Sequence, residues 1–436
     1  MRYFLFSIPL FISLAVSGQS YTSYFTGNPV NVNTAAEGGI CLMGGAAEND
    51  EAMIWFLKKA KGGDILVLRA SGSDGYNNYL HSSLGIAVNS VETIVFNSPV
   101  ASDEPYVHEK INNAEAIWFA GGNQWDYVSY WKNTPIDSLI NKAIKNRNIV
   151  IGGTSAGMAI QGKFYFTAQN GTVSSSQALH NPYNNNITID SASFISNNYL
   201  QDVITDTHYD NPDRKGRHIT FLARIFSDFG IVAKGIACDE NTAVCIDKNG
   251  LARVFGEYPN YNDNAYFIQT NCELANIAPE NCSNGAPLEW NLNKKAIKVY
   301  KVKGTTSGSN TFNLTDWKTG TGGVWENWYV QDATLFETAG TQIDCTTLLP
   351  ANKYLQKNIK VFPNPCYDKI NISSGNQLIK KIEIINSNGN ILKSLINLNT
   401  NAISIGSSKM PFGIYFIKVQ TNGAIYFQKL LILGFD

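Results

Sequence analysis

The feature of the sequence that most restricts its fold is a regular alternation of short apolar runs with amphipathic segments between residues 38 and 160. Apolar runs bounded by glycine or polar residues predict buried strands at 39–43, 65–68, 93–96, 116–119 and 149–152. Between them, Asp50–Lys59 and Pro135–Lys145 carry apolar residues at helical spacing, and Asn49 is placed to cap the first helix. Strands alternating with helices predict an α/β fold, with a mostly parallel sheet covered by helices on both faces.

The rest of the chain is richer in β-structure. From about residue 250 to 347, short β-like runs and Asn/Gly turns predict a β-rich extension of one large domain, which we expect over residues 20–347. A linker is expected at 348–357. Residues 358–436 then show short alternating runs, with turn signals at Asn388-Gly389 and Asn422-Gly423, which predict a small C-terminal all-β sandwich without obvious chemistry.

The N-terminal residues predict export. Arg2 precedes an apolar run from Tyr3 to Val16, and small residues follow, which is typical of a signal peptide over residues 1–19. The run is shorter than the roughly 20 residues that a spanning helix needs, and no later segment is long and apolar enough, so we expect no membrane span. The net charge of −1 gives no field that would attract nucleic acid.

The cysteines fit an oxidising compartment. Seven are present, and Cys272 with Cys282 is the stronger candidate disulfide, with Cys238 and Cys245 as a weaker pair. The sequence has no CxxC pair and no histidine cluster near the cysteines, so we expect no metal site. No motif indicates an organic cofactor.

The sharpest chemical signal is the run Gly152–Met158, which directly follows a predicted strand and fits the G-x-S-x-G elbow. Such a turn raises a serine hydroxyl, here that of Ser155, above the sheet at the start of a helix. The helix N-terminus then aims the N–H of Ala156 at a developing oxyanion. A phosphate loop would need a Lys-Ser/Thr pair that is absent, whereas a plain strand–helix turn remains an alternative.

Two further stretches could complete a site. In the turn 119–124, the N–H of Gly122 is a candidate second oxyanion donor and the amide of Gln124 could orient a substrate, although a structural turn is equally compatible. A serine nucleophile also needs a base within hydrogen-bond reach. Among five histidines, His208 is the best placed, because it follows an apolar run and lies near Asp206 and two arginines.

Taken together, these motifs resemble the peptidase family of cyanophycinases and aspartyl dipeptidases. The matching stretches are 43–46, 121–124, 153–157, 206–217 and 235–243. The resemblance implies a sheet of the class I glutamine amidotransferase-like or flavodoxin-like kind, with Ser155 as nucleophile and His208 as base. It also implies that four residues line the substrate pocket: Gln124, Asp206, Arg214 and Arg217.

The sequence departs from this family at three points. Pro212 occupies the place of the first arginine in the Arg-rich run, and Thr207 stands where cyanophycinases often have glutamine. The third departure concerns the acid of the triad, since no Asp or Glu occurs from residue 156 to 189. Asp190, Gln169 and Asn170 are the open candidates for orienting the imidazole.

The C-terminal tail resembles the sorting domain of the type IX (Por) secretion system of Bacteroidetes. The matching stretches are 362–365, 388–389, 412–415 and 427–430. The resemblance implies the type IX secretion machinery as a partner and passage across the outer membrane, to the cell surface or the medium. A carbohydrate-binding or adhesion sandwich is the alternative.

The sequence therefore predicts a secreted serine-type exopeptidase or related hydrolase that acts on acidic or β-aspartyl peptides, including β-Asp-Arg. A non-catalytic surface binding protein that retains the fold is the alternative, favoured by Pro212 and the missing acid. A lipase or esterase fits less well, because its histidine should lie near the end of the chain.

Overall fold

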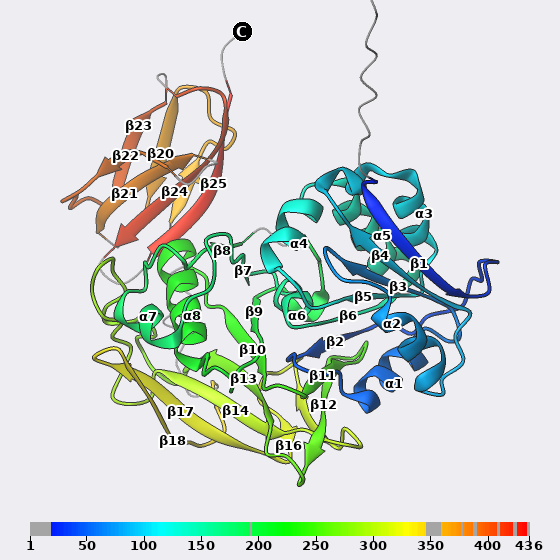
Figure 1. Cartoon of the computed structure of the whole chain (residues 1–436). Coiled ribbons are helices and arrows are strands. Elements are labelled where there is room, and N and C mark those ends of the chain that lie inside the picture. The colour runs from blue at the N-terminus through cyan, green and yellow to red at the C-terminus, as the bar shows by residue number, and fades with distance from the viewer. Residues whose placement is uncertain are drawn as a thin grey trace, which may run out of the picture.

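The computed structural model of the chain describes residues 19–191, 194–345, 359–375, 378–386, 390–407, 410–421 and 425–433 (Figure 1). Apart from Gln19, the predicted signal peptide lies outside the described residues, as do the predicted linker 348–357 and the turns at 388–389 and 422–423. No helix of the described residues has the length and apolar character needed to cross a membrane.

The first sheet has ten strands in the order β1-β4-β3-β5-β6-β2-β11-β12-β15-β16. Its centre is parallel and consists of β4 (Ser90–Phe96), β3 (Asp64–Arg69), β5 (Ala116–Phe119), β6 (Val150–Thr154) and β2 (Gly39–Met43). All five predicted strands are thus confirmed. The order β4-β3-β5-β6 corresponds to the 2-1-3-4 order of flavodoxin-like sheets, and β2 lies on the far side of β6.

Antiparallel strands extend this sheet at both edges. The strand β1 (Tyr21–Gly27) pairs with β4 at one edge and was not predicted. On the other side, β2 pairs with the first of four antiparallel strands, β11 (Ala243–Ile246), β12 (Leu251–Tyr258), β15 (Asn310–Asn313) and β16 (Gly320–Thr321).

Helices cover both faces of the parallel region, as predicted. One face packs against α1 (Asp50–Lys59), α2 (Gly75–Asn78) and the π-helical turn Tyr79–Ser83. The other packs against α3 (Pro105–Asn113), α4 (Gln124–Trp131) and α5 (Pro135–Arg147), with a 3-10 turn at Pro99–Asp103. The predicted cap is confirmed, because the side chain of Asn49 accepts a hydrogen bond from the N–H of Ala52 at 3.1 Å.

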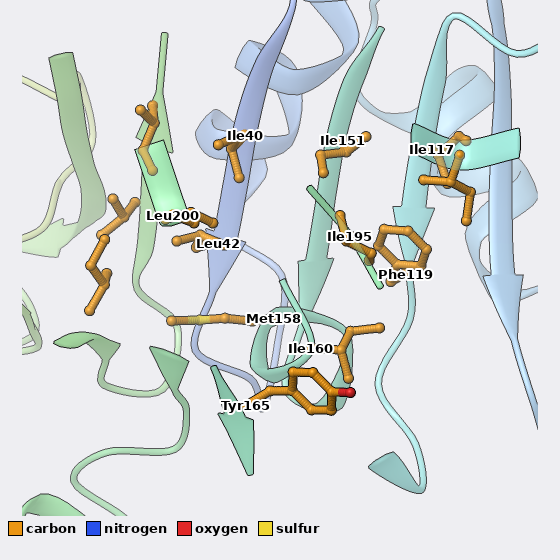
Figure 2. Close-up of a cluster of buried hydrophobic side chains, with 14 of the residues drawn as sticks. Ile40, Leu42, Ile117, Phe119, Ile151, Met158, Ile160, Tyr165, Ile195 and Leu200 are labelled. Atoms are coloured by element: carbon orange, nitrogen blue, oxygen red, sulfur yellow. The ribbon is translucent and has the colours of Figure 1, made fainter. Parts of the chain in front are cut away.

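Alternation along the strands separates the two cores. On β2, Ile40 and Leu42 point to the α5 side, whereas Cys41 and Met43 point to the α1 side. Figure 2 shows the first of these cores, where side chains from β2, β5 and β6 meet Met158 and Ile160, which follow the predicted elbow. The residues directly after the elbow therefore pack into this core, which holds the elbow in place.

The second sheet has six strands in the order β18-β17-β14-β13-β10-β9. Only β9 (Val203–Asp206) and β10 (Lys234–Cys238) are parallel. The antiparallel members are β13 (Asn264–Thr270), β14 (Ile297–Lys303), β17 (Gly323–Gln331) and β18 (Thr334–Ala339). The predicted β-rich extension thus supplies strands to both sheets. The helices α7 (Ser175–His180) and α8 (Lys215–Phe229) pack on the second sheet, and short elements lie between β6 and β9: α6 (Ala156–Ala159), β7 (Tyr165–Phe166), β8 (Ile189–Asp190) and Asn198–Leu200.

The disulfide pattern differs from the expected one. Cys272 is bonded to Cys345, whereas Cys282 is a free thiol, so the predicted small loop is wrong. The weaker predicted pair is also wrong, because Cys238 lies on β10 of the second sheet and Cys245 on β11 of the first, and both are buried free thiols. Sequence spacing cannot reveal which strands bring two cysteines together.

The C-terminal region is an all-β sandwich, as predicted. One sheet contains β19 (Lys360–Phe362), β20 (Lys369–Ser373) and β23 (Ala402–Gly406). The other contains β22 (Ile391–Leu395), β21 (Ile379–Asn386), β24 (Gly413–Thr421) and β25 (Ile425–Ile432). Isoleucine-rich inner faces enclose a core of their own, so the region has its own source of stability.

Candidate active site

The predicted elbow lies between β6 and α6. Ser155 has φ 51° and ψ −118°, a conformation that is costly for a residue with a side chain. Its N–H donates to the carbonyl oxygen of Met43 at 3.1 Å, which ties the turn to the end of β2. A Cβ at Gly153 would lie 2.5 Å from the Gly157 backbone, and one at Gly157 would lie 2.0 Å from the carbonyl oxygen of Phe119. The glycines are thus required by close backbone contact.

His208 meets Ser155 from the second sheet. It follows β9, and its Nε2 lies 2.9 Å from Ser155 Oγ. Its N–H donates to the carbonyl oxygen of Gly44 at 2.8 Å. Gly45 has φ +113°, and a Cβ there would lie 2.4 Å from the imidazole. The Gly-Gly turn after β2 is therefore the surface against which the imidazole packs.

The imidazole has a carboxylate partner that the sequence did not identify. His208 Nδ1 lies 2.6 Å from Oε1 of Glu240, which follows β10, the parallel neighbour of β9 (Figure 1). Both side chains are about one-fifth exposed. The open candidates for this role are not in contact with Nδ1: Asp190 pairs with Lys132, and the exposed Gln169 and Asn170 bond to Thr167 and Asn185.

A sequence signal for Glu240 was present. In an open α/β sheet, functional side chains gather where parallel strands end. The run 235–243, which resembles the family, contains the apolar residues that form β10 and places Asp239-Glu240 directly after them. The acid was expected soon after Ser155 in the sequence, whereas Glu240 lies beyond His208.

Two backbone donors lie open at the elbow. Among the described residues, the N–H groups of Ala156 and Gly122 have no hydrogen-bond acceptor. A Cβ at Gly121 would lie 3.6 Å from the Cβ of Ser155, so the glycine turn after β5 borders the nucleophile. Gln124 begins α4 beside this turn, and its buried Nε2 has no partner within the part of the chain that the structure describes.

Asp206 and Arg217 form a buried ion pair. Arg217 Nε donates to Asp206 Oδ2 at 2.9 Å, and both side chains are at most 5% exposed. Burial acts to raise the pKa of Asp206, but the charge and hydrogen bonds of Arg217 outweigh it and hold the pKa below its usual value. Arg214 is only partly buried and donates to the carbonyl oxygen of Thr207 at 3.1 Å, so it too supports the loop of His208. The predicted roles of these side chains in binding substrate stay predictions.

An acidic groove begins two residues after Gly45. It has a volume of about 490 Å³ and is lined by Ala47, Glu48, Asp50, Gly75, Tyr76 and Tyr79. The hydroxyl of Tyr79 donates to Asp50 at 2.7 Å, and that of Tyr76 donates to Glu48. Two carboxylates and two aromatic rings favour a cationic group. In the described part of the chain, no three His, Cys, Asp or Glu side chains are arranged to hold a metal ion.

Comparison with known proteins finds two matching families. The family described as Peptidase family S51 matches residues 73–254, and the family described as Secretion system C-terminal sorting domain matches residues 360–433. The predicted resemblances to a cyanophycinase-type peptidase and to a secretion sorting domain are confirmed.

Several cyanophycinases are similar to this chain. That of Geminocystis herdmanii is 28% identical over 155 residues, which is 36% of this chain and 51% of the relative. That of Trichormus variabilis is 23% identical over 172 residues, which is 39% and 52% of the two chains. The chain thus spans about half the length of these relatives. The crystal structure of a peptidase from an acI-B1 Actinobacterium is 14% identical with a TM-score of 0.41, covering 64% of this chain and 98% of that one.

Proposed function

We propose that this chain is a secreted serine-type hydrolase that cleaves β-aspartyl or acidic peptides through Ser155, His208 and Glu240. The observation that carries the proposal is the continuous chain of contacts from Ser155 Oγ to His208 Nε2 at 2.9 Å and from His208 Nδ1 to Glu240 at 2.6 Å. A serine becomes a nucleophile when a base accepts its proton and a third group orients that base.

Each group has a defined part in the reaction. His208 Nε2 takes the proton of Ser155 Oγ as the oxygen attacks the carbonyl carbon, and it then delivers that proton to the leaving amine. The carboxylate of Glu240 holds the Nδ1–H tautomer and stabilises the imidazolium. The unpaired N–H groups of Ala156 and Gly122 stabilise the oxyanion. In the second half of the reaction, His208 Nε2 takes a proton from a water molecule as the water attacks the acyl-enzyme. It then returns that proton to Ser155 Oγ as the acid product leaves.

The charged side chains around the site favour a substrate that carries both a negative and a positive group. Arg214 is partly exposed, and we assign it to a substrate carboxylate. Glu48 and Asp50 line the groove beside the Gly-Gly turn, which suits a guanidinium or ammonium group. A β-Asp-Arg unit carries both groups. We assign the buried pair of Asp206 and Arg217 to positioning the loop of His208, since each is the other's partner.

The alternative of a non-catalytic binding protein loses its main support. It was motivated by a missing triad acid and by Pro212, and the contact between Glu240 and His208 Nδ1 supports Glu240 as that acid. The exposed Pro212 remains as the departure that bears on substrate choice.

The test is hydrolysis of β-Asp-Arg polymer and a panel of aspartyl dipeptides by the purified protein and its Ser155→Ala variant. We expect Ser155-dependent release of product, and covalent labelling of Ser155 by a fluorophosphonate. Absence of both, in protein that is folded by circular dichroism, would support the binding protein instead.

The C-terminal sorting domain indicates export by the type IX system to the cell surface or beyond. We further propose that residues 1–19 are removed as a signal peptide. The N-terminal sequence of the secreted protein tests this, and an intact residue 1 would contradict it.

A further inference from the structure

We propose that Asp210 is a positioning residue for Glu240: its carboxylate holds the backbone of Glu240, so that the segments carrying the base and the acid form one unit. The inference rests on the proposed function, which gives Glu240 its role. Asp210 occupies one of the unspecified positions of the motif 206–217, and the resemblance to known peptidases assigns it nothing.

Three consecutive residues after His208 contact the segment that ends in Glu240. The N–H of Tyr209 donates to the carbonyl oxygen of Cys238 at 3.2 Å. Asp210 Oδ1 then accepts from the N–H of Glu240 at 2.9 Å. Asn211 Nδ2 approaches Glu240 Oε2 at 3.5 Å. Of these three residues, Asp210 and Asn211 contact Glu240 itself, and the hydrogen bond that Asp210 accepts is the shorter of the two.

The acid needs such support because it lies on an irregular segment at the end of β10, about one-fifth exposed. A glutamate has three rotatable bonds, and its carboxylate is well solvated when it turns outward. Fixing the N–H of Glu240 sets the direction in which its side chain leaves the backbone. The benefit is orientation, which raises the fraction of molecules with a correctly held imidazole.

The charge of Asp210 is not the useful property. Asp210 lies among carboxyl groups, and after burial its negative charge is among the causes that raise the pKa of Asp239 and of Asp263. Like charges so close repel one another. What the position requires is an oxygen acceptor on a short side chain. Asparagine supplies that acceptor without the charge, whereas alanine removes it.

The experiment compares full-length wild type with Asp210→Asn, Asp210→Ala and the control Asp316→Ala. Asp316 is matched, because its carboxylate also accepts backbone N–H groups, from Lys318 at 2.9 Å and Thr319 at 3.0 Å, but in the turn between β15 and β16. One readout is the rate of fluorophosphonate labelling of Ser155. The other is the low-field resonance of the His208 Nδ1–H in protein labelled with [15N]histidine, which does not depend on turnover.

We expect Asp210→Ala to label about tenfold more slowly at saturating probe, which corresponds to about 1.4 kcal/mol, and its Nδ1–H resonance to broaden or disappear. Asp210→Asn and Asp316→Ala should remain within threefold of wild type and keep the resonance. In a Glu240→Ala background, adding Asp210→Ala should change the labelling rate by less than twofold, because the group it positions is gone.

The inference is overturned if Asp210→Ala keeps both the resonance and the labelling rate, or if Asp210→Asn fails as badly as Asp210→Ala. Failure of the proposed function is a different result. In that case wild type is not labelled at Ser155, while the resonance still responds to Asp210→Ala and not to Asp316→Ala, and the positioning of Glu240 stands without catalysis.

Discussion

Replacing Glu240 by glutamine is the most informative single change. The substitution keeps the size of the side chain but removes its charge. Its amide N–H groups can also donate to His208 Nδ1, which favours the imidazole tautomer with an unprotonated Nδ1 and a protonated Nε2. In that tautomer Nε2 carries the proton and cannot accept one from Ser155, although the two atoms stay 2.9 Å apart.

The size of the effect follows from burial. Loss of a buried triad acid lowers kcat by about 10⁴ in well-studied serine proteases. The Glu240 side chain is 22% exposed, so water can replace part of the lost charge. We therefore expect kcat to fall about 10²- to 10³-fold, or roughly 3 to 4 kcal/mol in activation free energy, with KM nearly unchanged.

The assay is hydrolysis of the preferred substrate from the aspartyl panel, with Ser155→Ala as the baseline and Glu257→Gln as the control. Glu257 is an exposed glutamate on β12, and its removal should leave kcat within twofold. The reasoning is refuted if Glu240→Gln keeps kcat within threefold of wild type. Loss of activity in Asp190→Asn instead would return the role of the acid to that side chain.

Three further predictions concern the surroundings of the site. Gly45→Ala should cost about 1–3 kcal/mol of stability and lower kcat more than tenfold, because the new Cβ would lie 2.4 Å from the imidazole of His208. Thermal melts and activity assays measure both effects. The control is Gly406→Ala, whose Cβ would have open space around it. Arg217→Met should destabilise the fold by about 3–5 kcal/mol in denaturant titrations, because Asp206 is left charged and buried, and adding Asp206→Asn should recover more than half of the loss. Burial raises the pKa of Asp239 from 3.8 to about 6, so the folded state binds this proton more tightly than the unfolded chain. The contribution of Asp239 to the free energy of unfolding is therefore fully present below about pH 4 and is lost as the pH rises through 6, about 3 kcal/mol in all. In urea titrations, Asp239→Asn should gain stability relative to wild type as the pH rises across that window. A pH-independent difference between the two proteins would contradict this.

The elements that the sequence predicted are those with a strong local pattern. The strand at 116–119 and the helix at 50–59 have the bounds expected from hydrophobic periodicity, because all four residues of the strand, and Met53, Phe56 and Leu57 on the helix, are buried. Ser155 was also predictable, since the G-x-S-x-G pattern directly after a strand is a local sequence signal. By contrast, β1 is an edge strand with a partly exposed face, and its residues carry little periodic signal.

The residues that the sequence did not predict depend on contacts between distant segments. Glu240 reaches His208 only because β9 and β10 are parallel neighbours, which periodicity does not show. The bond between Cys272 and Cys345 likewise joins a loop to a segment beyond the last strand of the second sheet. The ion pair between Arg217 on α8 and Asp206 at the end of β9 also joins two separate elements, and both side chains are buried.

The distribution of the triad over two sheets has a consequence for when the chain becomes active. Ser155 follows β6 of the ten-stranded sheet, whereas His208 and Glu240 follow β9 and β10 of the six-stranded sheet. Strands from the region after residue 250 complete both sheets, so nucleophile and base meet only when nearly the whole α/β domain has folded. Partly synthesised or unfolded chains therefore lack the contacts among Ser155, His208 and Glu240, so the proposed function requires a nearly complete α/β domain.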